Sequence, residues 1–221
     1  MSEALLVILS IVALEALLSG DNALVLAVMV KPLPPHLRAR ALLYGLVGAY
    51  ALRGLALVFA FWLLQLWWME VLGGVYLVYL MLRHFQGGSK EAPSLTARDF
   101  VRLVILINLV DLAFAIDSIL VVVAFSKDLV LVFLGVALGI LLIRLAAGRL
   151  VRLMEAYPAL EKVAYALVGW AGVKLLLEGW ATFSELSHHP EWALSLPKAV
   201  FWGVTLGILL LGSLLAVRRH A

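Results

Sequence analysis

The feature that most constrains this chain is a series of seven long apolar runs separated by short polar breaks. A helix that spans a bilayer needs about 20 predominantly apolar residues, so seven spans would use about 140 residues. The chain has 221 residues, of which 65% are apolar and 14% charged. A soluble domain is about half apolar and about a quarter charged. We therefore predict an all-α polytopic membrane protein with no separate soluble domain.

The breaks between the apolar runs set the limits of the predicted spans. We place these spans near residues 4–30, 42–64, 69–82, 99–126, 129–147, 162–181 and 198–217. Residues 1–221 then form a single transmembrane domain. The chain contains no cysteine, which excludes disulfides, thiolate metal sites and a thiol nucleophile.

The basic residues between the spans are distributed unevenly across the membrane. One side carries twelve of them: Lys31, Arg38, Arg40, Arg83, Lys90, Arg98, Arg102, Arg149, Arg152, Lys162, Arg218 and Arg219. The other side carries Lys127 and Lys198. Because an excess of Lys and Arg marks the cytoplasmic side, we expect the N-terminus outside and the C-terminus in the cytoplasm. The net charge of +3 then reports orientation, and we expect no binding to nucleic acid.

Two segments of the chain resemble each other at an offset of 96 residues. The pattern is an acid, five residues, a second acid and a small polar residue. Its first copy, in the first span, consists of Glu15, Asp21 and Asn22. Its second copy, in the fourth span, consists of Asp111, Asp117 and Ser118. The chain therefore contains a duplicated acidic motif.

Weaker correspondences follow in the next two spans of each unit. They pair Gly48 with Gly139, Arg53 with Arg144, and Gly74 with Gly172. Three spans thus form each unit, near 4–82 and 99–181, and one extra helix follows near 198–217. Because three is odd, the second unit enters the membrane from the opposite side. Such an inverted 3+3 repeat plus one terminal helix is typical of secondary transporters.

Eight ionisable residues lie well inside the predicted spans. They are the acids Glu15, Asp21, Asp111, Asp117 and Glu178 and the bases Arg53, Arg144 and Lys174. Each costs about 2.5–3.5 kcal/mol at the centre of a helix in the bilayer, so these residues require partners or a purpose. Five acids minus three bases leave a charge of −2 if all are ionised. A divalent cation balances that charge, and so does proton uptake by carboxylates that have lost water.

Part of this charge has a purely structural interpretation. Lys174 and Glu178 are four residues apart on one helix and can neutralise each other. Arg53 and Arg144 occupy matched places in the two units, and we expect them to brace neighbouring carboxylates rather than contact a substrate. The alternative that the acids form only structural ion pairs stays open at this point.

Helix geometry predicts which polar side chains share a face. Residues seven apart fall only about 20° short of two full turns, so Glu15 and Asn22 lie on one face with Ser19 nearby. By the same rule, Asp111 and Ser118 share a face, and the Asn108 side chain is within reach of it.

The second acid of the motif points in another direction. In an ideal helix Asp21 lies about 120° from Glu15, so one site lined by all four acids requires local breaks in the helices. Ser19-Gly20 is the predicted break in the first span, and carbonyl groups freed there could also serve as ligands. The fourth span has Ala115-Ile116 at the same place, which favours a break less.

The donor atoms of the motif narrow the choice of ion. The motif residues offer carboxylates, an amide and hydroxyls, which are all oxygen donors, whereas no histidine or methionine lies in the motif. Oxygen ligands suit Mg²⁺, Ca²⁺ or Mn²⁺, while Zn²⁺, Cu²⁺ and Ni²⁺ usually recruit nitrogen or sulfur. The residues alone therefore predict a site for a hard divalent cation.

Several segments match the motifs of one known family. They are Glu15-Ala-Leu-Leu-Ser-Gly-Asp-Asn-Ala-Leu-Val, Arg40-Ala-Leu-Leu-Tyr-Gly-Leu-Val-Gly-Ala, Asp111-Leu-Ala-Phe-Ala-Ile-Asp-Ser-Ile and Gly172-Val-Lys-Leu-Leu-Leu-Glu. In these segments, and over nearly the whole chain, the sequence resembles the TerC family. The paired acidic motifs make this resemblance specific.

The resemblance implies a LysE-like transporter built from two units of three helices and one further helix. It also implies that the transporter exports Mn²⁺ across the bacterial inner membrane. It implies that the metal ligands are Glu15, Asp21, Asn22, Asp111, Asp117 and Ser118. From the residues we assign supporting or proton-coupling roles to Ser19, Arg53, Asn108, Arg144, Lys174 and Glu178. Mn²⁺ is then the transported ion, and we expect no prosthetic group.

Proton exchange is the expected form of coupling. Carboxylates around a departed divalent ion repel one another where water is scarce, so we expect the empty site to take up protons. We predict Mn²⁺/H⁺ antiport, with Glu15 or Asp111 as the proton carriers because they lie farther from the Asp-Asn and Asp-Ser pairs.

Two other classes of function stay open. One is a LysE-like exporter of a basic amino acid, whose carboxylate would bind Arg53 or Arg144. The other is a non-transporting membrane partner that helps to load metal onto exported enzymes. We do not expect an enzyme, because no Ser/His/Asp set or phosphate loop is present. The sequence leaves self-association open.

Overall fold

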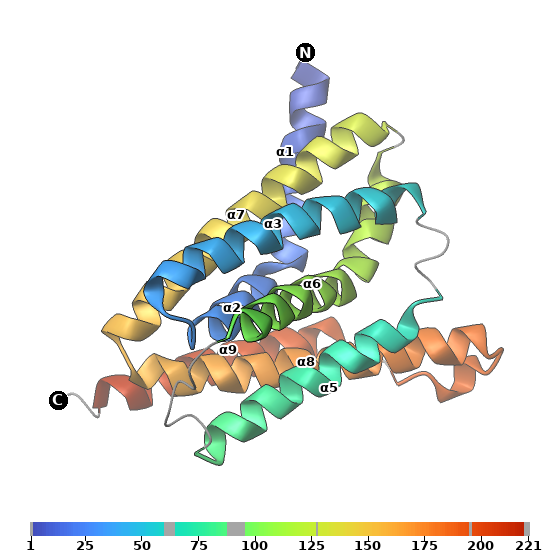
Figure 1. Ribbon diagram of the computed structural model, residues 1–221. Helices are drawn as coiled ribbons and strands as arrows, with labels where there is room; N and C mark the ends of the chain where they lie inside the picture. The colour runs from blue at the N-terminus through green and yellow to red at the C-terminus, as the bar shows by residue number, and fades with distance from the viewer. Residues whose placement is uncertain (1, 60–64, 88–95, 127, 195, 219–221) are drawn as a thin grey trace.

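The structure of the protein is a computed structural model that describes residues 2–59, 65–87, 96–126, 128–194 and 196–218. Its helices are α1 (Ser2–Leu18), α2 (Gly20–Val30), α3 (Pro35–Val58), α5 (Trp67–Phe85), α6 (Ala97–Phe125), α7 (Leu129–Ala156), α8 (Ala159–Leu186), the 3₁₀ helix η1 (Pro190–Trp192) and α9 (Lys198–Arg218). The described residues contain no strand, which confirms the all-α class for that part of the chain (Figure 1).

A described helix or helix pair overlaps each of the seven predicted spans, but several helices are longer than predicted. The predicted end of the second span, at residues 60–64, lies outside the described residues. Helix α3 begins at Pro35 rather than near residue 42, and α7 continues to Ala156 rather than ending near residue 147. Basic residues such as Arg38 and Arg149 lie on these extensions. Backbone hydrogen bonding continues a helix past its apolar segment, so the apolar run marks only the middle of a helix and not its ends.

The first predicted span is broken at Ser19, as the sequence predicts. Helix α1 ends at Leu18, α2 begins at Gly20, and the pair is bent by 58°. The Ser19 hydroxyl donates to Glu15 Oε1 at 3.2 Å instead of capping α2. The Asn22 N–H donates to the Ser19 carbonyl, but the start of α2 has no side-chain cap.

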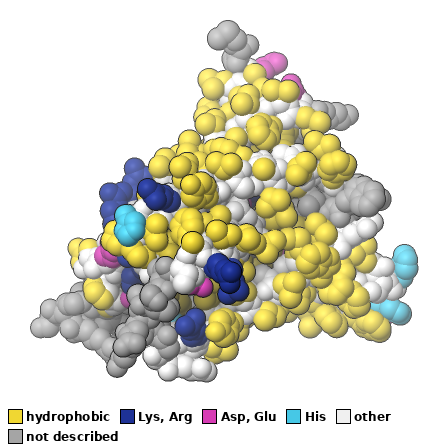
Figure 2. All heavy atoms as spheres, viewed as in Figure 1, with side chains coloured by type: hydrophobic (Ala, Val, Ile, Leu, Met, Phe, Trp, Pro, Cys, Tyr) yellow, Lys and Arg dark blue, Asp and Glu magenta, His cyan; other side chains and the backbone are white. Residues whose placement is uncertain are grey.

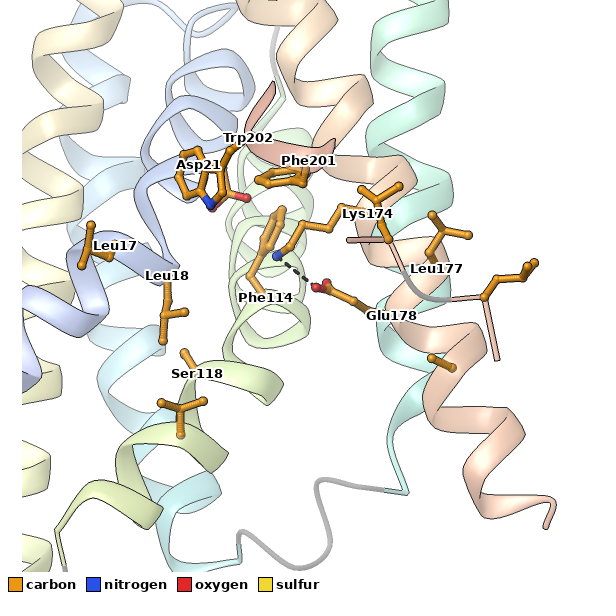
Figure 3. A pocket seen from close by; sticks show the side chains of 14 residues that line it. Leu17, Leu18, Asp21, Phe114, Ser118, Lys174, Leu177, Glu178, Phe201 and Trp202 are labelled. Carbon is orange, nitrogen blue, oxygen red and sulfur yellow. Dashed lines mark ion pairs between the residues drawn. The ribbon is translucent and has the colours of Figure 1, made fainter. Parts of the chain in front are cut away.

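Helix α6 differs from the α1–α2 pair in this respect. It is helical throughout Ala97–Phe125, with no break at Ala115-Ile116. Its course nevertheless changes direction between Phe114 and Ser118 in Figure 3. The two copies of the acidic motif therefore lie on differently shaped backbones.

Three helix pairs hold the bundle together. Helix α5 packs extensively against α8, α1 packs against α7, and α3 packs against α6. The α5–α8 contact is closest at two glycines. A Cβ atom on Gly74 would lie 2.7 Å from the Gly172 carbonyl oxygen, and one on Gly172 would lie 2.9 Å from the Gly74 carbonyl oxygen. Only glycine permits this reciprocal backbone approach.

Two described helices, α3 and α7, are long and apolar enough to cross a membrane, and the bent α1–α2 pair is a third if it forms one span. Among the described residues, helix length and composition therefore support two or three of the seven predicted spans. Helices α6 and α8 carry ionisable residues well inside their length, such as Asp111 and Glu178, which lowers their mean hydropathy. Figure 2 shows hydrophobic side chains over most of the visible face of the molecule.

Candidate functional site

The most deeply buried charges form a connected group of ion pairs. Arg53 on α3 pairs through Nη1 with Glu15 on α1, and its Nε lies 3.7 Å from Asp111 Oδ2 on α6. Arg144 Nη2 on α7 lies 3.9 Å from the same Asp111 oxygen. Each of these four side chains is at most 4% exposed. We call Glu15, Arg53, Asp111 and Arg144 the arginine network.

The arginine network is tightly packed, and its two carboxylates face two guanidinium groups. Arg144 also donates to the Gly45 carbonyl at 3.1 Å. Gly139 leaves room for the acid of α1, since a Cβ atom there would lie 2.6 Å from Glu15 Cγ. Such a pair is stable only while both partners remain, because a lone buried charge is costly. This geometry agrees with the bracing role predicted for Arg53 and Arg144, although the role itself stays a prediction.

A cavity of about 730 Å³ lies beside the break between α1 and α2 (Figure 3). Its polar lining comes from three elements: α2, α6 and α8. We call these four lining residues the cavity cluster: Asp21, Ser118, Lys174 and Glu178. Apolar residues form the rest of the lining, among them Leu17, Phe114, Leu177, Leu194, Phe201 and Trp202. The cavity cluster therefore brings one residue from each acidic motif to a common space.

Lys174 and Glu178 form the ion pair that their spacing predicts. Lys174 Nζ lies 3.2 Å from Glu178 Oε1, and Figure 3 shows both side chains reaching toward each other from α8. Their side chains are 24% and 29% exposed, far more than those of the arginine network. Lys174 also acts electrostatically on the Asp21 carboxylate across the cavity.

Asp21 and Asn22 present buried polar atoms in the first turn of α2. Asp21 Oδ1 and both polar atoms of the Asn22 amide have no hydrogen-bond partner among the described residues. Buried polar atoms normally have partners, so these atoms are candidates for binding a ligand. The start of a helix is also a place where negative charge is favourable, and Asp21 lies in the first turn of α2.

Asn108 and Ser19 both have local structural contacts. The Asn108 amide donates to the Val104 carbonyl at 2.8 Å. A Cβ atom added to Gly48 would lie only 2.2 Å from Asn108 Oδ1, so the side chain fits closely against this glycine. Asn108 therefore packs α6 against α3. Ser19 joins the arginine network through its bond to Glu15. The supporting roles predicted for both residues stay predictions.

The predicted ligands fall into two regions rather than one. Glu15 and Asp111 lie in the arginine network, whereas Asp21 and Ser118 line the cavity. Across the part of the chain that the structure describes, no group of three or more His, Cys, Asp or Glu side chains could hold a metal ion. Asp117 is on α6, but its side chain lies outside the described set. The six-residue ligand set therefore stays a prediction.

One further acid, Glu70, is deeply buried although no sequence motif indicated it. It lies in the first turn of α5 and is 1% exposed. The Thr182 hydroxyl of α8 lies 3.5 Å from Glu70 Oε2 and donates to it. Glu70 stands next to the start of a predicted span, where an acid is usually solvated at the interface. The nearby Gly73-Gly74 pair, which brings α5 against α8, is the signal that could have indicated its burial.

Comparisons with known proteins agree with the resemblance carried by the acidic motifs. Residues 1–220 match the family described as "Integral membrane protein TerC family". The chain is 41% identical to "Uncharacterized membrane protein YceF" of Bacillus subtilis, over 81% of this chain and 73% of the relative. It is 35% identical to "Uncharacterized membrane protein YkoY" of the same organism, over 93% of this chain and 70% of the relative.

A more distant relative is "UPF0053 inner membrane protein YgdQ" of Escherichia coli, which is 25% identical over 76% of this chain and 78% of the relative. No solved structure gives a significant match. The family match covers all but the last residue, and it is supported by relatives that share more than a third of their aligned residues. The chain therefore belongs to the integral membrane protein TerC family.

Proposed function

We propose that this protein is a secondary transporter that exports a hard divalent cation, Mn²⁺ foremost, in exchange for protons. The observation that carries the proposal is the cavity between α2, α6 and α8. There, Asp21 of the first acidic motif and Ser118 of the second line one space together with Glu178. All three offer oxygen ligands, and the adjacent Asn22 amide offers another. Oxygen donors of mixed charge suit an ion that must both bind and leave.

The choice of Mn²⁺ over Mg²⁺ rests on ligand chemistry and on the family resemblance. Mg²⁺ loses its water reluctantly and requires near-ideal octahedral geometry, whereas carboxylate and carbonyl oxygens suit Mn²⁺ as well. A cavity wall with only a few fixed carboxylates therefore favours Mn²⁺ in this proposal.

The helix pairing supports an inverted repeat of three helices. The first proposed unit consists of the α1–α2 pair, α3 and α5, and the second consists of α6, α7 and α8. The first helix of each unit packs against the second helix of the other, because α1 packs against α7 and α6 packs against α3. The third helices, α5 and α8, meet each other through the reciprocal contact of Gly74 and Gly172. Arg53 pairs with the first acid of its own unit, and Arg144 does so in the other unit. This exchange of equivalent contacts is what a two-fold relation between units would produce.

The distribution of charge supports the proposed orientation, with the C-terminus in the cytoplasm. In Figure 1 the α2–α3 and α7–α8 connections lie at the same end of the molecule as the last turn of α9, and the start of α5 and the end of α8 lie at the other end. In Figure 2, which has the same view, the visible Lys and Arg side chains gather toward the side where α9 ends. The charge count also includes Lys90, Lys127 and Arg219, which lie outside the described residues.

The proposed inner end is closed by ion pairs between the two units. Lys31 at the end of α2 pairs with Glu161 of α8, and Arg38 of α3 pairs with Glu155 of α7. The cavity instead reaches Leu194, in the segment between η1 and α9 on the proposed outer side. We therefore propose that the structure represents an outward-facing state of the transport cycle.

The contacts of the acids bear on which of them carry protons. Glu15 and Asp111, the carriers predicted from the sequence, already face guanidinium groups that balance their charge. Asp21 and Glu178 line the cavity, where an arriving cation would compete directly with protons. We therefore propose the cavity acids as the primary proton carriers, with the role of Glu15 and Asp111 left as a prediction.

Uptake of competing ions into proteoliposomes tests the proposal. We expect purified protein to move Mn²⁺ in preference to Mg²⁺, Ca²⁺ and Zn²⁺, without any partner protein. Transport of lysine or arginine with no Mn²⁺ transport would favour the amino acid exporter instead. Binding of Mn²⁺ without transport would favour the metal-loading partner.

A further inference from the structure

Lys174 places a positive charge on the wall of a cavity that is proposed to bind a positive ion. Its ammonium group has partners of two kinds on two helices. Nζ lies 3.2 Å from Glu178 Oε1 on α8 and 5.6 Å from the centre of the Phe201 ring on α9. Figure 3 shows the Lys174 side chain extending from α8 between that ring and the carboxylate. Either partner can therefore hold the ammonium group after a small movement of this flexible side chain.

The Phe201 ring is fixed in place by its contacts with α8. It is 9% exposed, and it stacks on the Trp170 ring with the centroids 6.0 Å apart and 13° between the planes. Trp170 Nε1 also donates to the Phe201 carbonyl at 3.4 Å. Trp170 lies four residues before Lys174, so both face the same side of α8. Because an aromatic face attracts an ammonium group within about 6 Å of its centre, this ring is a preformed place for the lysine.

The internal repeat does not reproduce this arrangement in the first unit. The correspondence of Gly74 with Gly172 places Tyr76 of α5 where the second unit has Lys174. Phe201 lies on α9, which follows both units. The cation and its aromatic partner are therefore additions to the repeated framework, and the packing of that framework does not by itself require them.

The charge of the cavity cluster shows what the lysine can do there. Two acids, Asp21 and Glu178, and one base, Lys174, leave one negative charge. Lys174 acts electrostatically on Asp21 as well as on Glu178. Before an ion arrives, the ammonium group reduces the repulsion between the two carboxylates. A divalent ion that binds these carboxylates repels the same ammonium group, and the Phe201 ring offers it another partner.

We propose that Lys174 is a tethered cation that pairs with the cavity carboxylates before the metal ion binds and moves to the Phe201 ring when the ion is bound. This inference rests on the proposed function and specifies how the site releases its ion. When the ion leaves, the ammonium group returns to Glu178, so the carboxylates are not left without a cation. Lys174 keeps its charge throughout, and the movement involves no proton transfer.

Calorimetric titration with Mn²⁺ and Mn²⁺ flux into proteoliposomes test the inference on full-length protein. Lys174→Met should bind Mn²⁺ about threefold to tenfold more tightly, and its maximal rate of transport should fall several-fold because release becomes slow. Phe201→Leu should change the affinity in the opposite direction. Its binding should weaken about twofold to fivefold, because Lys174 then stays at Glu178 and competes with the ion.

A double-mutant cycle of these two substitutions gives the sharpest comparison. In the Lys174→Met background, Phe201→Leu should no longer weaken binding, because the side chain that the ring holds is gone. Phe201→Tyr keeps an aromatic face and should bind Mn²⁺ within about twofold of wild type. The matched control is Lys162→Met, which removes an exposed cation from the same helix and should change neither affinity nor rate.

A second probe keeps the test decisive if Phe201→Leu does not fold. Trifluorophenylalanine in place of Phe201 keeps the shape of the ring but weakens the negative charge on its face. We expect it to weaken Mn²⁺ binding in the presence of Lys174 and to have no effect in Lys174→Met.

The outcomes separate this inference from the proposed function. If wild-type protein transports Mn²⁺ but Phe201→Leu weakens binding equally with and without Lys174, the ring acts only through packing. The inference is then wrong and the function stands. Tighter binding in Lys174→Met with an unchanged maximal rate would also overturn the inference, because release would not depend on the lysine. If wild-type protein neither binds nor moves Mn²⁺, the proposed function fails and the inference fails with it.

Discussion

The arginine network and the cavity cluster contain the same kinds of residue in opposite environments. In the arginine network, Glu15 and Asp111 face guanidinium groups and are at most 4% exposed. In the cavity cluster, Asp21 lies beside a space of about 730 Å³, and the Lys174–Glu178 pair is about a quarter exposed. The first acid of both motif copies, Glu15 and Asp111, thus lies in packed protein. The second acid of the first copy, Asp21, lies at a cavity.

This difference indicates a division of labour within one motif. A buried carboxylate that is paired with arginine holds helices together, because separating the pair leaves a costly charge. A carboxylate beside a cavity is free to exchange partners, which is what a transported ion requires. We therefore expect the two regions to respond differently to the same kind of substitution.

The largest expected effect is on stability in the arginine network. Arg53→Met should lower the free energy of unfolding by about 3–5 kcal/mol, because Glu15 and Asp111 lose the cation that they share. Thermal unfolding in detergent measures the change. Lys174→Met is the matched control, since it removes a cation from the cavity and should cost far less. Equal destabilisation by both variants would remove the distinction between the regions.

The next effect is on ion binding at the cavity. Asp21→Asn should weaken Mn²⁺ binding about 100-fold, which is about 2.7 kcal/mol, because it removes a full charge from the wall. Asp117→Asn should have a similar effect, because the sequence predicts Asp117 as the equivalent acid of the second motif. Asn22→Ala should have a smaller effect because a neutral ligand is lost. Calorimetric titration gives the affinities, with the exposed Glu191→Gln as control. Unchanged affinity in both Asp variants would refute this site.

A pair of glycines tests packing in the two regions. Gly139→Ala should cost about 1–3 kcal/mol of stability, because its Cβ would meet the Glu15 side chain at 2.6 Å. Gly20→Ala, at the break beside the cavity, meets no atom within 4 Å and should be nearly neutral. Chemical unfolding of both variants makes the comparison. A tolerated Gly139→Ala would show that the network is looser than described.

The smallest expected effect concerns the cation in the cavity. Lys174→Met should strengthen Mn²⁺ binding about threefold to tenfold, because it removes a positive charge that acts on Asp21 and pairs with Glu178. Titration at low ionic strength gives the largest signal, since salt screens the effect. Weaker binding in Lys174→Met would indicate that this side chain supports the site instead of competing with the ion.

The sequence predicted the helices well because long apolar runs and helix breakers are local features. The break at Ser19-Gly20 and the i, i+4 pair of Lys174 and Glu178 follow from residues close together in the chain. The ends of α3 and α7 were missed because a hydrogen-bonded helix extends beyond its apolar segment. The seven-span membrane arrangement stays a prediction.

The site was harder to predict because its contacts join helices far apart in the chain. The sequence indicated that arginines would face acids, but not that Arg53 of the first unit reaches Asp111 of the second. Helix geometry indicated that Asp21 points away from Glu15, but not that Glu15 would join the arginines while Asp21 lined a cavity. The burial of Glu70 depends on the close approach of α5 and α8, which no local pattern shows.

Transport by reconstituted protein tests the central claim most directly, namely that the cavity carries the ion and the arginine network braces the fold. Mn²⁺ and proton movement are followed together in proteoliposomes that hold wild type or Asp21→Asn. We predict Mn²⁺ entry with opposite proton movement in wild type, weaker at low pH because protons compete for the carboxylates. The folded Asp21→Asn variant should show neither flux. Wild-type rates of Mn²⁺ entry in Asp21→Asn would contradict the account.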